Sequence, residues 1–327
     1  MITEIAVKNF KSLKNITVQT RNLNLLMGLN GMGKSSFIQT LLLLMQSDKL
    51  EDRILDLKGL LTQIGQGRDA FYQFATEEFI EFHFGFDNQE FYNMKFKYQS
   101  DKEKLTAGNG FTKKQMEFFR ESTKKFQYIN AERIPPQDIY DASSVVVADK
   151  KQLGLQGEFT AYYINLFGGT HEVRKELQHT DAISTKLNAQ LNAWMHEISP
   201  GISINTKYIP EVNKVILDYQ FDYGNQKTNP FRPKNVGFGI SYVLPIVLAL
   251  LTAEEGKIIV LENPESHIHP RGQAQLGKLI SLAASIGAQL FVETHSDHIL
   301  NGIRVAVKEQ YIEKEKVNIM YFEFTTT

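Results

Sequence analysis

The 327-residue chain has no cysteine, almost no net charge and no long apolar stretch. Without cysteine there is no disulfide and no cysteine-ligated zinc, which is typical of a reducing compartment. The net charge is −1, so overall charge does not attract the chain to nucleic acid or to an anionic membrane. The longest apolar stretch, residues 240–251, is too short to span a bilayer. We therefore expect a cytoplasmic protein with no membrane partner.

One segment carries a specific chemistry, because Gly28–Ser35 matches the pattern G-x-x-x-x-G-K-[ST]. Apolar residues at 23–27 predict a strand before it, and residues 37–45 predict a helix after it. Backbone N–H groups of such a loop bind phosphate oxygens, and the helix N-terminus adds partial positive charge. The sequence therefore predicts a nucleoside triphosphate site with Mg²⁺ on Ser35. The expected nucleotide contacts are Asn30, Gly31, Gly33, Lys34, Ser35 and Ser36.

Two further segments end apolar runs with polar side chains. Residues 258–261 predict a buried strand that ends in Glu262, a suitable Mg²⁺ ligand opposite a phosphate loop. Residues 290–293 predict a second strand, followed by His295. A neutral imidazole there can bind a γ-phosphate or a water molecule. The competing interpretation is a histidine that caps a helix or packs at the edge of the core.

In order along the chain, these segments resemble motifs of the ABC-type ATPase heads of the SMC/RecF/OLD kind. Residues 1–13 resemble the N-terminal hairpin, 28–35 the Walker A loop, 235–246 the signature motif, 262–270 Walker B with the D-loop, and 293–296 the switch-histidine block. Within this group the chain is most similar to small AAA-type, OLD-like ATPases of bacterial anti-phage systems, such as the Septu ATPase.

The resemblance implies a fold, two cofactors and a partner. The fold is an α/β, ABC-type P-loop NTPase head with an N-terminal β-subdomain and a helical insertion, and the cofactors are ATP and Mg²⁺. Gly239 allows close backbone approach and Ser241 can begin a helix that faces an anion. In the family this helix binds the nucleotide of a second subunit, which implies a homodimer or higher oligomer. A simple turn before a core helix is the alternative.

One position departs from the family pattern. Walker B usually ends in two acids, whereas here Asn263 follows Glu262. Asparagine cannot accept a proton, so it is a poor general base. We expect Glu262, Glu265 and His295 to be the catalytic residues, with Glu265 supplying the missing carboxylate or His295 positioning water alone. Slow hydrolysis is the alternative.

Several choices stay open at this level. The family's metal-watching glutamine is Gln46, Gln63 or Gln66. Five charged residues are either ligand or partner contacts or solvated loop charges: Glu132, Arg133, Lys227, Arg232 and Lys234. A zinc site would require His267 and His269 to meet His295 and His298.

The pattern also predicts the domain organisation. We expect a first part of the head in residues 1–100, a helical insertion or lid in 101–200, and the rest of the head in 201–327. Residues 181–198 predict an amphipathic helix whose apolar stripe includes Ile183. No heptad pattern persists, so no long coiled coil is expected. The sequence ends with an expected strand at 319–324 and three threonines, so we expect it to end in mid-strand, as a truncated chain would.

Three functions compete. The first is an ATPase that dimerises around nucleotide and switches a partner effector, such as a nuclease, in anti-phage defence. The second is a DNA-binding ATPase of the RecF kind. The third is an ATP-bound scaffold with little turnover.

Overall fold

The computed structural model describes residues 1–47, 53–108, 125–224 and 226–323. Contacts between residues divide the chain into two compact units. Unit 1 contains residues 1–126 and 317–327, and unit 2 contains residues 127–316. The three-part division expected from the sequence stays a prediction.

Unit 1 contains the phosphate loop within a largely antiparallel framework. Its sheet has the order β2-β1-β5-β6, while β15 pairs in parallel with β3, and β4 pairs with β7. The elements are β1 (Ile2–Phe10), β2 (Leu13–Gln19), β3 (Leu23–Gly28), α1 (Lys34–Gln46), β4 (Ile54–Asp56), α2 (Gly67–Ala70), β5 (Phe79–Phe86), β6 (Phe91–Lys97), β7 (Lys104–Thr106) and β15 (Val317–Phe322).

The core of unit 1 follows from alternation of side chains along its strands. Ile80, Phe82 and Phe84 point to one face of β5 and are fully or almost fully buried. Phe82 meets Phe10 of β1 edge to face, with ring centroids 5.4 Å apart. Helix α1 is apolar around most of its surface and is buried along most of its length. The phosphate loop is therefore joined to a helix that is fixed by its surroundings.

Unit 2 contains the other sequence blocks. At its start lie β8 (Phe126–Ile129), β9 (Ile139–Asp141), η2 (Val145–Asp149), α4 (Thr160–Phe167), η3 (Lys175–Leu177) and α5 (Leu187–Ile198). Then follow β10 (Ile202–Ile209), η4 (Pro210–Val212), β11 (Lys214–Tyr223), β12 (Gln226–Lys227), η5 (Pro233–Asn235) and α6 (Phe238–Leu251). The last elements are β13 (Ile258–Glu262), α7 (Pro270–Ser285), β14 (Gln289–Glu293), α8 (Asp297–Lys308) and η6 (Lys314–Lys316).

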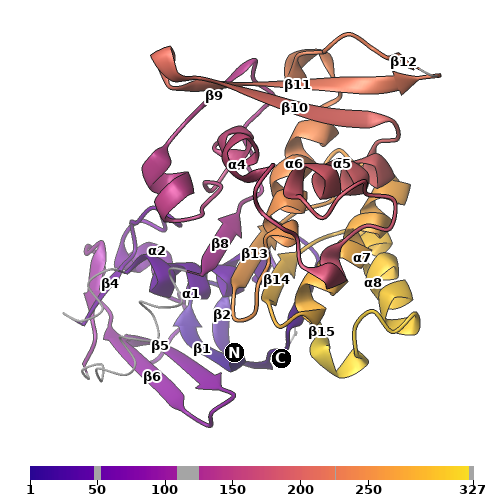
Figure 1. Ribbon diagram of the computed structural model, residues 1–327. Helices are drawn as coiled ribbons and strands as arrows, with labels where there is room; N and C mark the ends of the chain where they lie inside the picture. Colours follow the sequence, from indigo (N-terminus) through magenta and orange to yellow (C-terminus); the bar gives the residue numbers. More distant parts are fainter. Residues whose placement is uncertain (48–52, 109–124, 225, 324–327) are drawn as a thin grey trace. The chain divides into compact units, whose positions relative to one another are not determined.

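Two layers organise unit 2. Strands β13 and β14 are parallel, buried and in register from Ile258↔Gln289 to Glu262↔Glu293, and β8 lies beside β13. The long antiparallel pair β10–β11, extended by β9, runs over α4 and α5 (Figure 1). The carboxyl ends of the parallel strands deliver the polar blocks to one edge of the sheet.

The sequence-based prediction for residues 181–198 is partly wrong. The helix begins only at Leu187, and Ile183 is 96% exposed instead of lying on a buried stripe. Gln190 of the helix explains this, because its side chain accepts from the His179 N–H and donates to the Ser184 carbonyl. These bonds hold the preceding segment as a loop. The last strand begins at Val317, and residue 324 lies outside the described part.

The longest helix in the described ranges is α7, with 16 residues, which fits the expectation of no long coiled coil. None of the helices in those ranges is long and apolar enough to cross a membrane.

Candidate functional site

The phosphate loop in unit 1 binds the side chain of its own lysine, Lys34, through main-chain carbonyls. Lys34 is only 3% exposed, and its Nζ donates to the carbonyls of Gly28 and Leu29, at 2.8 Å each. Gly31 and Gly33 have φ values of 79° and 102°, which favour glycine. Helix α1 starts directly at Lys34. The loop thus presents a buried ammonium group at a helix N-terminus, an arrangement suited to an anion.

The turn between β1 and β2 packs against this loop. A Cβ at Gly33 would lie 2.8 Å from Leu13 Cδ2 and 3.0 Å from Ser12 Oγ. The hydroxyls of Ser12 and Ser36 are 3.4 Å apart, while Ser35 is exposed. The N-terminal hairpin block therefore packs against the loop, and Ser36 faces this support.

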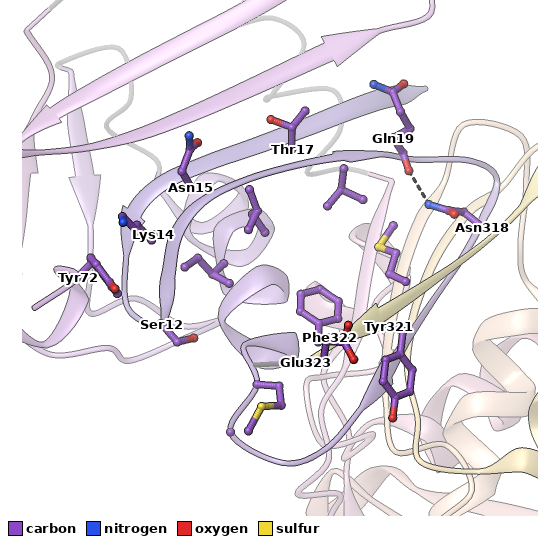
Figure 2. A pocket seen from close by; sticks show the side chains of 16 residues that line it. Ser12, Lys14, Asn15, Thr17, Gln19, Tyr72, Asn318, Tyr321, Phe322 and Glu323 are labelled. Atoms are coloured by element: carbon purple, nitrogen blue, oxygen red, sulfur yellow. Dashed lines mark hydrogen bonds between the residues drawn. The ribbon is translucent and has the colours of Figure 1, made fainter. Parts of the chain in front are cut away.

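A groove of about 810 Å³ opens beside the loop within unit 1 (Figure 2). One wall is β2 and the other is β15, and Gly31 and Met32 lie at its rim. The Asn318 side chain bridges the two strands by donating to the Gln19 carbonyl at 2.6 Å. This groove leaves no signal in the sequence, because its walls come from opposite ends of the chain.

Of the three candidate glutamines, Gln46 is engaged in unit 1. Its amide donates to the carbonyls of Asp56 and Thr62, and its oxygen accepts from the N–H groups of Leu61 and Thr62. Reaching a metal would break these four bonds. Gln63 is exposed, whereas Gln66 lies at the start of the short helix α2.

In unit 2, Glu262 lies in a row of polar groups at the strand ends. Its Oε1 accepts from the Tyr128 hydroxyl at 3.0 Å, and its Oε2 accepts from the Ala131 N–H at 3.2 Å. Glu293 is its register partner on β14. Burial, and then the charge of Glu293, raise the pKa of Glu262. A carboxylate fixed in this way is suited to a cation.

Arg133 holds the main chain just after that carboxylate. Nη1 donates to the carbonyls of Glu262 at 2.8 Å and Asn130 at 3.1 Å, and Nη2 donates to the Asn263 carbonyl at 2.7 Å. Burial lowers the pKa of Arg133 to about 10. The side chain is 4% exposed, so the expectation of a ligand contact or a solvated loop charge is wrong.

The expected catalytic residues Glu265 and His295 are linked through the main chain. Glu265 accepts from the Thr294 hydroxyl at 2.7 Å and from the His295 N–H at 2.8 Å. His295 itself is exposed, and Asn263 has a left-handed φ of 45°. Both oxygens of Glu265 thus accept bonds that join the turn after β13 to the end of β14.

The signature block differs from the expectation in two respects. Helix α6 begins at Phe238, so Ser241 lies one turn inside it, and its hydroxyl is 3.2 Å from that of Tyr219. Gly239 is needed for packing inside the subunit, because a Cβ there would lie 2.1 Å from the His267 carbonyl. The exposed side chain at the helix start is Phe238, at 58%.

The alternative zinc site built from four histidines is not found among the described residues. The only group of three metal-type side chains there is His179, Asp181 and Glu197. His179 Nδ1 accepts from the Asp181 N–H, which places the ring proton on Nε2, 3.5 Å from Glu197 Oε1. The Nδ1 lone pair is thus used by a main-chain N–H.

Comparison with known proteins supports one class of protein. Residues 1–150 match the model of an AAA ATPase domain, and residues 185–301 match that of an "AAA domain, putative AbiEii toxin, Type IV TA system". An uncharacterized protein of Methanocaldococcus jannaschii is 32% identical over 66 residues, which cover 20% of this chain and only 8% of that protein.

Solved structures support the fold. An SMC head bound to the C-winged helix domain of ScpA is similar with a TM-score of 0.54 and 13% identity, and an Smc head with an extended coiled coil, bound to the C-terminal domain of ScpA derived from Pyrococcus furiosus, with 0.54 and 11%. Each comparison covers 92% of this chain and 91% of the other. The two family models support an ATPase with AAA-type domains, and the solved structures show a fold similar to that of SMC heads.

Proposed function

We propose that the protein binds and hydrolyses Mg·ATP. The observation that carries this proposal is the closed loop around Lys34, whose ammonium group is bonded only to main-chain carbonyls in the described residues. Its charge is therefore not neutralised by a carboxylate and is available to phosphate. The adjoining groove offers space for the nucleoside, with polar groups from Ser12 and Lys14 on its wall (Figure 2).

The unit 2 residues complete the proposal. In this proposal Glu262 and Ser35 would hold Mg²⁺, which would supply positive charge to the phosphates. Asn30, Gly31, Gly33, Lys34 and Ser36 surround the nucleotide. Glu265 and His295 orient water. These assignments rest on the order of the motifs and on the geometry inside each unit.

Hydrolysis is slow in this proposal. Asn263 cannot act as a general base, and both oxygens of Glu265 already accept hydrogen bonds. ATP therefore acts chiefly to hold two copies together, with the start of α6 facing the nucleotide of the other copy. The exposed Phe238 and the resemblance to SMC-type heads support this arrangement.

The biological role follows as a further part of the proposal. An ATP-dependent homodimer suits the control of a separate effector, such as a nuclease, in anti-phage defence. The family matched by residues 185–301, which is described as a putative AbiEii toxin of a Type IV TA system, supports such a role. DNA-stimulated phosphate release would instead indicate a DNA-binding ATPase of the RecF kind.

The deciding experiment compares Lys34→Ala with Lys58→Ala, an exposed lysine of the same unit. Loss of the loop ammonium should weaken binding of a fluorescent ATP analogue by about 100-fold or more, because a charge-assisted contact to phosphate is lost. Phosphate release should fall to background, whereas Lys58→Ala should behave as wild type. Unchanged nucleotide affinity in Lys34→Ala would refute the assignment of the phosphate loop.

A further inference from the structure

The segment from Tyr128 to Arg133 encloses the carboxyl end of β13. Tyr128 and the Ala131 N–H hold the two carboxylate oxygens of Glu262. Arg133 holds the carbonyl oxygens of Glu262 and of the next residue, Asn263. One short segment thus fixes both the side chain and the main chain at the proposed metal ligand.

The conformation that Arg133 stabilises is unusual. Two consecutive carbonyls can point to one guanidinium only if the chain turns sharply, and Asn263 does so with a φ of 45°. The planar fork of an arginine suits two such acceptors, whereas a lysine ammonium group has no comparable fork. The same carbonyl of Asn263 also accepts from the Ser266 hydroxyl at 2.9 Å, which continues the turn toward Glu265.

Arg133 also contacts the helix of the signature block. Its guanidinium lies over the ring of Tyr242 in α6, 5.7 Å from the centroid. The ring of Tyr242 also stacks with that of His267, which lies outside this helix, at 5.3 Å between ring centroids. The turn after β13 and the start of α6 are therefore linked through one buried side chain.

The geometry excludes a direct ligand contact by Arg133. The side chain is 4% exposed, and both terminal nitrogens are used by carbonyls. Its Nε is buried and has no hydrogen-bond partner. Arg133 therefore acts through other residues.

We propose that Arg133 is a positioning residue that holds the Glu262–Asn263 turn in the form that presents the Glu262 carboxylate to Mg²⁺, and that ties this turn to α6. The inference rests on the proposed ATPase function.

The test uses Arg133→Lys in the full chain, which keeps the charge and removes the fork. Arg174→Lys, at an exposed arginine, is the matched control. Without nucleotide, amide hydrogen exchange in residues 261–268 should become about tenfold faster in Arg133→Lys, with no change in β14, because hydrogen bonds to a charged group are lost. With ATP, the Mg²⁺ concentration for half-maximal activity should rise roughly five- to tenfold and kcat should fall, while ATP binding in EDTA stays within about twofold of wild type.

The outcomes separate the two proposals. Unchanged exchange and unchanged Mg²⁺ dependence in Arg133→Lys would overturn the positioning role while leaving the ATPase intact. A wild-type protein that neither binds nor hydrolyses Mg·ATP would refute the proposed function, and the metal role of Arg133 with it. If Arg133→Lys does not fold, Tyr242→Leu decides, because loss of the ring should shift exchange in the same turn in the same direction, and no shift overturns the link to α6.

Discussion

Three buried cations share one property at the scale of single residues. Lys34, Arg133 and Lys257 are each at most 9% exposed, and each donates to main-chain carbonyls. A carbonyl orients a cation without cancelling its charge, unlike a carboxylate. The charge of Lys34 is therefore available to a phosphate, and the charge of Arg133 fixes a turn. At Lys257 the burial of the charged form costs free energy.

That cost predicts a pH dependence for Lys257. Burial lowers its pKa from 10.5 to about 8. Between these values the unfolded chain binds the proton and the folded chain does not, so stability should rise with pH through that window. Relative to Lys257→Met, the wild type should gain up to about 3 kcal/mol of unfolding free energy between pH 8 and 10.5.

Urea unfolding at several pH values measures this difference, with the exposed Lys58→Met as control. A difference between wild type and Lys257→Met that stays constant with pH would show that Lys257 keeps its proton on folding.

At the scale of elements, α7 and α8 pack with a close approach of their backbones. A Cβ at Gly302 would lie 2.1 Å from the Ala274 carbonyl oxygen, and one at Gly277 would lie 2.5 Å from that of Ile299. The two helices therefore cross with their backbones in near contact. Helix α7 follows the D-loop block and α8 follows the switch-histidine block, so this crossing fixes the two blocks relative to each other.

Gly302→Ala should weaken this crossing. The added methyl group meets backbone, which cannot move as a side chain can, so a loss of about 1–3 kcal/mol in unfolding free energy is expected. Asn301→Ala, at the exposed neighbouring position, is the control and should change stability little. Denaturant unfolding of both variants checks this, and equal midpoints would show that the helices separate without cost.

At the scale of the whole molecule, the phosphate loop belongs to unit 1, whereas the carboxylate, signature and histidine blocks belong to unit 2. The proposed function requires α6 to face a second copy. Phe238 at the start of this helix is 58% exposed, and such a contact would bury its side chain.

Mg·ATP should therefore convert the 37.3 kDa chain to a species of about twice that mass. Phe238→Arg should prevent this while leaving the nucleotide affinity of the single copy unchanged, because a charge is costly to bury in an interface. Tyr223→Arg, at an 81% exposed side chain on β11, is the control. Light scattering after gel filtration measures the mass, and dimers of Phe238→Arg would exclude α6 from the contact.

The sequence by itself determined the phosphate loop, the order of the motif blocks and most strands and helices, because glycine spacing and side-chain periodicity are local properties. Only the tertiary structure showed the contacts of Gln46, Arg133 and Gly239 and the later start of α5. Arg133 shows the reason, since its acceptors Glu262 and Asn263 lie 129 and 130 residues away. Such a contact leaves no periodic pattern in one sequence, so its burial becomes visible only when the chain has folded.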